Sequence, residues 1–164
     1  MIIETQESGK RIIDKTGPLH NPADRNHCIQ YMVAIPLIFG RLTAEDYEDA
    51  VACDPRIDGL RDKMQIVERK QFTIDYLDPE KRSIGNSVQV FFKDGSQTQP
   101  VAVEYPIGHR RRRKEGVPAL LGKFERNLRG RIPARKADAI LTLSSDRARL
   151  EATAVDRLMD LFVV

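Results

Sequence analysis

The chain has 164 residues, of which 41% are hydrophobic and 31% charged, and this composition is that of an ordinary globular protein rather than a disordered one. A net charge of +3, from 27 basic and 24 acidic residues, is too small to imply a polyanionic partner by itself. The longest apolar run, Met32 to Phe39, has eight residues and contains Pro36, so it is far shorter than the roughly 20 residues of a membrane span. We therefore expect no membrane partner.

The amino terminus, the cysteines and the length give three further expectations. Residues 1–7 carry acidic side chains and lack the basic stretch and apolar core of a secretion signal, which predicts a cytoplasmic location. Cys28 lies in an apolar pattern and Cys53 is far from it in sequence, so we expect buried reduced thiols rather than a disulfide or a metal pair. A chain of about 150 residues suits one hydrophobic core, which predicts a single domain over residues 1–164.

The amino-terminal third predicts a strand followed by a long buried helix. Residues 2–13 mix β-branched and polar side chains, which favours a strand, and a turn follows. Asn21 and Pro22 are typical of a helix start, and Gly40 of a helix end, so we expect one helix over residues 23–39. That helix is apolar nearly all round, so we expect another domain or a second copy to cover it, and hence self-association.

Two shorter helices are predicted next, one beginning near Thr43 and one at Asp54-Pro55. Strands are then predicted over residues 66–68 and 72–74, and over the two arms of a hairpin, residues 86–92 and 99–105. The turn of this hairpin contains Asp94-Gly95, which is the strongest short hairpin signal.

The last third predicts three helices, over residues 118–128, 133–143 and 154–162, with a polar break over residues 144–149. Strands and helices are thus grouped along the chain rather than strictly alternating. The sequence therefore predicts an α+β fold, with an antiparallel sheet and helices packed on one side.

The chain lacks the common patterns of metal and nucleotide sites. Its three histidines, His20, His27 and His109, do not have zinc-ligand spacing, and the glycine-rich loops that hold phosphates are missing. A Gly-x-Ser-x-Gly elbow is missing too. We therefore expect no metal and no cofactor.

The run of five cations over residues 110–114 has three possible interpretations. It could contact nucleic-acid phosphates, but no aromatic residue interleaves with the arginines and two glutamates flank the run closely, so nucleic acid is the unlikely partner. It could pair with an acidic surface of another domain or subunit. It could also use forked guanidinium groups to hold a polycarboxylate.

A second group of candidate residues lies at the start of the predicted helix over residues 23–39. Arg25 and His27 follow Asp24 there, where the helix dipole and free N–H groups favour an anion. The alternative is that these residues only support the helix start and the surface. His109 has the same two interpretations, and Gly108 before it indicates either a special backbone conformation or only a turn.

Several segments together resemble the carboxy-terminal part of the MmgE/PrpD family. Those that carry the resemblance are residues 11–15, 21–40, 54–58, 75–82, 104–113 and 158–162. The Asn-Pro opening, Gln30-Tyr31 and Gly40 are similar to the wider family. Tyr105-Pro106-Ile107-Gly108-His109 followed by arginines resembles the branch that acts on 2-methylcitrate.

The resemblance implies a cytoplasmic homodimer that removes water from 2-methylcitrate in propionate breakdown, without an iron–sulfur cluster. It also implies that the large helical domain of the family, which supplies most of the catalytic groups, is absent from this chain. We therefore assign no catalytic residue and expect the isolated chain to be inactive. Its implied partners are the missing helical domain and a tricarboxylate, with Arg25, His27, His109 and Arg110 as the residues expected to approach that substrate.

A free-standing module is the alternative to an enzyme fragment. In that interpretation the cations of residues 110–114 bind nucleic acid or an acidic protein. Binding to random duplex that weakens steeply with salt would favour it.

Overall fold

The structure is a computed structural model that describes residues 1–163. These residues form two compact units, unit 1 over Met1–Pro106 and unit 2 from Ile107 to the end of the described residues. Each unit is described by itself below. The expectation of a single domain over residues 1–164 stays a prediction.

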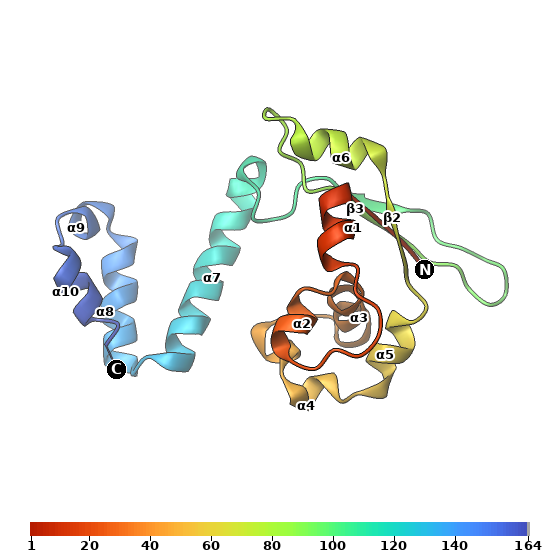
Figure 1. The fold of residues 1–164 in the computed structure, drawn as a ribbon. Coiled ribbons are helices and arrows are strands. Elements are labelled where there is room, and N and C mark those ends of the chain that lie inside the picture. The colour runs from red at the N-terminus through yellow and green to blue at the C-terminus, as the bar shows by residue number, and fades with distance from the viewer. Residues whose placement is uncertain (164) are drawn as a thin grey trace. The chain divides into compact units, whose positions relative to one another are not determined.

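Unit 1 contains a four-stranded mixed sheet (Figure 1) in the order β2-β1-β3-β4. The strands are β1 (Ile2–Thr5), β2 (Gln65–Glu68), β3 (Asn86–Gln89) and β4 (Val101–Val103). β1 runs parallel to β2 and antiparallel to β3, so that Ile3 lies opposite both Ile66 and Val88. Since paired positions share a face of a sheet, these three side chains form one apolar face.

Unit 1 contains six α-helices and one 3₁₀ helix. They are α1 (Glu7–Ile13), α2 (Pro22–Asn26), α3 (Ile29–Phe39), the 3₁₀ helix η1 (Ala44–Tyr47), α4 (Asp49–Ala52), α5 (Pro55–Arg61) and α6 (Lys70–Leu77). The side chain of Asn21 accepts a hydrogen bond from the N–H of Asp24, and that of Asp54 accepts one from Arg56. Gly40 ends α3 at a φ of 70°, a value that glycine adopts without strain.

The predicted helix over residues 23–39 is divided in two. α2 ends at Asn26, His27 and Cys28 leave helical geometry, and α3 then begins at Ile29. Two features of the break favour it. Cys28 is fully buried there, and its single S–H has two acceptors within reach, the carbonyl oxygen of Lys15 at 3.4 Å and the side-chain oxygen of Gln30 at 3.3 Å.

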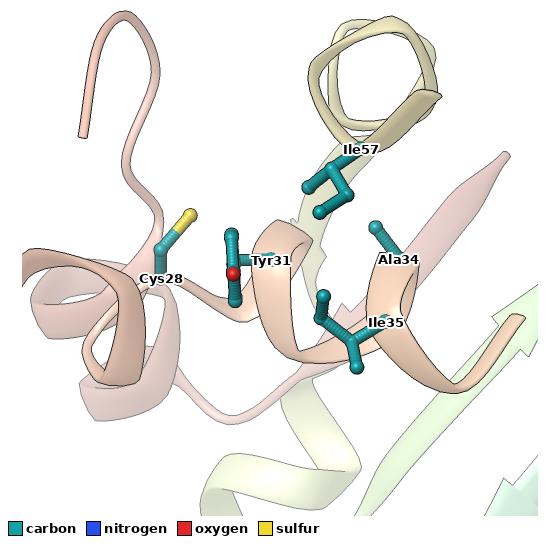
Figure 2. Close-up of a cluster of buried hydrophobic side chains, with 5 residues drawn as sticks. All are labelled: Cys28, Tyr31, Ala34, Ile35 and Ile57. Atoms are coloured by element: carbon teal, nitrogen blue, oxygen red, sulfur yellow. The ribbon is translucent and has the colours of Figure 1, made fainter. Parts of the chain in front are cut away.

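The cover that α3 needs comes largely from unit 1 itself. Figure 2 shows Ile57 of α5 pointing toward Ala34 and Ile35 of α3, with Tyr31 and Cys28 along the same side. Another part of α3 packs on the apolar face of the sheet, where Ile29 meets Ile3 and Ile66. Self-association was predicted because α3 was expected to lack cover. Leu37, at 55% exposure, is the main apolar side chain of α3 that unit 1 leaves uncovered, so little of that reason remains.

Two predicted strand segments are helical instead. Only residues 2–5 of the segment 2–13 are a strand, and residues 7–13 form α1, while residues 72–74 lie in α6. α1 and α6 pack against each other, and the backbone N–H of Glu7 donates to the hydroxyl of Thr73 at 2.9 Å. Packing between these helices therefore overrides the strand preference of their β-branched residues.

The predicted hairpin is confirmed. β3 and β4 pair antiparallel, Phe91 bridges to Gln97, and Gly95 in the connecting turn has a φ of 84°. β4 is an edge strand, and its three residues are exposed.

Unit 2 consists of helices among the residues that the structure describes. They are the 3₁₀ helix η2 (Arg110–Arg112), α7 (Arg113–Arg131), α8 (Ala134–Ser145), α9 (Arg147–Glu151) and α10 (Val155–Asp160). Leu128 of α7 packs with Ala137 and Ile140 of α8 to form its core. α7 begins five residues before the predicted start at Pro118, and α9 occupies part of the predicted polar break, with the side chain of Asp146 accepting from Arg149.

The α+β class is confirmed, and the sheet is mostly antiparallel. Its one parallel pair, β1 with β2, was not predicted, and helices pack around the sheet rather than forming one simple layer. Within residues 1–163, no helix is long and apolar enough to cross a membrane.

Candidate substrate-binding residues

Arg25 is a buried cation that ties α2 to the segment after it. Its side chain is enclosed, and the residue is 6% exposed. One guanidinium nitrogen, Nη1, donates to the carbonyl of Tyr47 at 2.7 Å, and Nη2 lies 2.7 Å from the carboxylate of Asp49. Since burying an unpaired cation is costly, these contacts are what allow Arg25 to lie inside unit 1.

Arg25 also lines a cavity of about 210 Å³. Tyr31, Asp49, Cys53 and Asp58 share that cavity, together with Leu19 and Ala52. The hydroxyl of Tyr31 donates to the carbonyl of Asp46 at 2.7 Å, and burial raises the pKa of Tyr31 above its ordinary value. Tyr31 is therefore a neutral, oriented group beside the cation.

The Arg25–Asp49 pair is asymmetric in exposure. The Asp49 side chain is 85% exposed, whereas that of Arg25 is 7% exposed. The exposed carboxylate regains water when it leaves the pair, whereas the buried guanidinium loses its counter-ion, so the exchange requires another anion to take its place. A substrate carboxylate that took the place of Asp49 would bind Nη2 of Arg25, while Nη1 stays hydrogen-bonded to the carbonyl of Tyr47.

The helix dipole gives weaker support to an anion site here than the sequence suggests. α2 has five residues rather than the expected seventeen, and Asn21 already accepts from its first turn. Asp24 is also occupied, since its carboxylate accepts from the N–H of His20 at 3.2 Å and pairs with Lys15. These contacts lower the pKa of Asp24, with the His20 hydrogen bond as the largest cause.

His27 lies at the carboxyl end of α2 and is exposed. Its Nδ1 is hydrogen-bonded to the side-chain oxygen of Asn26 and lies 3.3 Å from the carbonyl of Ala23. Arg25 and His27 are two residues apart on one turn, a spacing that does not place side chains together on a helix. His27 therefore presents an imidazole to solvent, away from the buried fork of Arg25.

His109 organises the start of the basic run in unit 2. It is nearly buried, at 9% exposure, and its Nδ1 accepts from the backbone N–H of Arg111 at 3.2 Å. This bond caps η2, the turn that holds the first three arginines of the run. Arg112 then binds Glu115 through two nitrogens, at 3.2 and 2.6 Å, which lowers the pKa of Glu115.

The special glycine of this region is Gly116 rather than Gly108. Gly108 does not have a positive φ, and a Cβ there would meet open space. A Cβ on Gly116 would lie 2.3 Å from the carbonyl oxygen of Ile107. Gly108 thus lies in a simple turn, and the constraint in this region is a close approach by α7 at Gly116, which local sequence does not reveal.

The four candidate residues belong to different units. Arg25 and His27 lie in unit 1, and His109 and Arg110 lie in unit 2. A cleft that gathers all four therefore stays a prediction. Among the described residues no group of three or more histidine, cysteine or acidic side chains is arranged to hold a metal ion.

Sequence reasoning missed the cavity beside Arg25. Tyr31 was noted for its likeness to other proteins and not as a cavity residue, and Asp49 and Asp58 carried no signal because they come from separate short helices. The expectation of two buried thiols holds for Cys28, whereas Cys53 is exposed and lines the cavity. Both thiols are free.

Comparison with known proteins identifies relatives of the chain. Residues 2–147 match the family model described as MmgE/PrpD C-terminal domain. The 2-methylcitrate dehydratase of Salmonella typhimurium is 59% identical over 162 residues, which cover 99% of this chain and 34% of that relative.

Similar relatives occur in other organisms. The 2-methylcitrate dehydratase of Cupriavidus necator is 56% identical over 99% of this chain and 34% of its own length. The mitochondrial 2-methylcitrate dehydratase of Yarrowia lipolytica is 56% identical over 98% of this chain and 31% of its own length. The chain thus spans about a third of the length of these relatives.

Proposed function

Because the chain belongs to the MmgE/PrpD family and matches its C-terminal domain, we propose that it is the carboxy-terminal part of a 2-methylcitrate dehydratase. The reaction would remove water from 2-methylcitrate to give 2-methyl-cis-aconitate, in propionate breakdown by the methylcitrate cycle. The observation that carries this proposal is 56–59% identity to 2-methylcitrate dehydratases over 99% of the chain.

The proposal assigns the chain a role in binding rather than in proton transfer. Dehydration of this kind needs a base, an acid and cations that stabilise the charge developing beside a carboxylate. The chain supplies cations: the buried guanidinium of Arg25 beside the exposed carboxylate of Asp49, and the arginines that follow His109. We assign the base and the acid to the part of the enzyme that this chain does not span.

The proposed substrate-binding residues are Arg25, His27, His109 and Arg110. Forked guanidinium groups bind carboxylates through two parallel hydrogen bonds, and a tricarboxylate offers three such groups. His27 is exposed, and His109 holds the turn that begins with Arg110. The proposed partners are therefore a tricarboxylate such as 2-methylcitrate and the helical domain of the complete enzyme.

A homodimer and a cytoplasmic location complete the proposal. Both rest on the family resemblance, and the relative from Yarrowia lipolytica is described as mitochondrial. Sedimentation of a full-length form would test the oligomeric state.

An activity assay tests the proposal directly. The isolated chain, mixed with 2-methylcitrate at a stoichiometric enzyme level, should give no rise in the ultraviolet absorbance of the unsaturated product. A hybrid polypeptide should give that rise; it carries this chain in place of the matched 162 residues of the Salmonella relative. Robust turnover by the isolated chain would contradict the proposal, because it would show that this chain itself contains the catalytic groups.

A further inference from the structure

One apolar stripe runs along α7 of unit 2 and is covered over only half of its length. The stripe consists of side chains at helical spacing: Val117, Leu120, Leu121, Phe124 and Leu128. Leu128 and Phe124 pack against α8 in the core of unit 2. In Figure 1, α8 begins near the carboxy-terminal end of α7, and α9 and α10 lie beside α8.

Within the described part of unit 2, the amino-terminal half of the stripe has no such cover. Leu120 is 65% exposed and Leu121 is 59% exposed, and Val117 is 49% exposed one turn earlier. Burial of exposed leucines stabilises a complex, so an exposed apolar cluster at the end of a buried stripe marks an interaction surface.

Charges border this exposed half-stripe. Arg113 and Lys114 are exposed at its beginning, on either side of the apolar line that starts at Val117. Unit 2 as a whole has 14 basic and seven acidic residues, whereas unit 1 has 13 basic and 17 acidic residues. The surface is therefore an apolar patch within a strongly basic unit.

A second copy of the chain is a poor occupant for such a surface. Two copies that met through the same face would place Arg113 and Lys114 of both chains on the border of one desolvated patch. Like charges at an interface oppose association, so the rim disfavours self-pairing. The occupant that fits has an apolar face and an acidic rim.

We propose that the half-stripe of Val117, Leu120 and Leu121 is the docking surface for the polypeptide that makes up the other two thirds of the full-length enzyme. This inference rests on the proposed function, because the covering polypeptide is the rest of that enzyme. The relatives that match the chain are about three times as long as the matched region, so an occupant of sufficient size exists in each of them. The basic rim then meets acidic side chains of that polypeptide.

Cysteine labelling tests the surface. Leu121→Cys places a thiol on the half-stripe, and Ala119→Cys places one on the opposite side of the same helix, where Ala119 is also exposed. Both variants are made in the isolated chain and in the hybrid with the Salmonella relative. Maleimide labelling is followed at each cysteine by peptide mass spectrometry.

In the isolated chain both cysteines should label rapidly and at a rate that does not depend on chain concentration. In the hybrid the rate at residue 121 should fall about tenfold or more, while that at residue 119 stays within about threefold, because thiol reactivity follows exposure. Equal rates at residue 121 in the two forms would overturn the proposal. A rate at residue 121 that falls as the isolated chain is concentrated would assign the surface to a second copy and overturn it as well.

Two further arms separate this inference from the proposed function. A hybrid that dehydrates 2-methylcitrate but labels fully at residue 121 contradicts the docking surface and leaves the function in place. A folded, inactive hybrid with a protected residue 121 contradicts the function and supports the surface. If the hybrid does not fold, the same two cysteines are placed at the aligned positions of the Salmonella relative, where the same difference in labelling is expected and equal labelling overturns the proposal.

Discussion

Gly116 shows how a single residue fixes part of the candidate site. Its missing side chain lets α7 approach the carbonyl of Ile107, two residues before His109. Gly116→Ala should lower the free energy of unfolding by about 1–3 kcal/mol, because a Cβ at that place must displace backbone atoms. Urea unfolding of the chain measures the change.

Gly130→Ala is the matched control in the same helix. A Cβ at Gly130 meets nothing within 4 Å, so alanine should raise the free energy of unfolding by about 0.5–1 kcal/mol through its better helix propensity. Two variants with the same sign would contradict the assignment of a special role to Gly116.

The proposed substrate residues can be separated by kinetics in the hybrid. Arg110→Ala should raise the KM for 2-methylcitrate about tenfold or more, whereas Arg113→Ala should change it little, if the first arginine reaches the substrate. A thermal unfolding midpoint that stays the same in both variants excludes a folding effect. Equal, small changes in KM would contradict a role in substrate binding and favour the interpretation in which residues 110–114 only pair with an acidic surface.

At the level of single residues the sequence predicted caps better than binding contacts. Asn21, Gly40 and Asp54 act as expected because a cap depends on a few neighbouring backbone groups. The burial of Arg25 and its bond to Tyr47 could not be predicted, because they depend on a segment 22 residues further along the chain. Gly116 escaped notice for the same reason.

The connection between α6 and β3 is an element held by one carboxylate. The carboxylate of Asp75 in α6 accepts a hydrogen bond from the ammonium group of Lys81 at 2.6 Å. The backbone carbonyl of Asp75 accepts another from the N–H of Ser83. The side-chain hydrogen bond from Lys81 is the largest cause that lowers the pKa of Asp75. The charged carboxylate therefore holds the segment that leads to the hairpin.

This coupling predicts a pH dependence of stability. Since the pKa of Asp75 is lower in the folded chain than in the unfolded one, its contribution is present above the unfolded value of about 3.9 and is lost as the pH falls through the folded value. The free energy of unfolding should therefore decline more steeply between about pH 5 and pH 3 in the natural chain than in Asp75→Asn. Urea unfolding at several pH values measures both slopes, and parallel curves would contradict the assignment.

At the level of elements, strong local signals succeeded and weak ones failed. The hairpin around Asp94-Gly95 and the helix over Ala134–Ser145 were predicted because turn chemistry and apolar periodicity are read from adjacent residues. Residues of α1 and α6 were predicted as strand because their β-branched side chains favour strands. Packing between the two helices outweighs that preference, and the local sequence does not show this packing. The parallel pairing of β1 with β2 joins residues about 60 positions apart, which no local pattern specifies.

At the level of the whole molecule, the expectation of one domain can be tested with the natural chromophores. All four tyrosines, Tyr31, Tyr47, Tyr76 and Tyr105, lie in unit 1, and the chain has no tryptophan. Tyrosine fluorescence therefore follows unit 1, while far-ultraviolet circular dichroism also follows the helices of unit 2. A single domain predicts coincident urea transitions by the two probes, and separate midpoints would make the units independent domains.

The central claim is that this chain is the carboxy-terminal part of a 2-methylcitrate dehydratase and acts only with the rest of the enzyme. The most direct measurement is the kcat/KM of the hybrid for 2-methylcitrate, set beside that of the parent Salmonella enzyme. We predict a value within about tenfold of the parent, since tenfold corresponds to about 1.4 kcal/mol of transition-state stabilisation. A hybrid that folds and yet has a kcat/KM lower by about a thousandfold or more would contradict the claim.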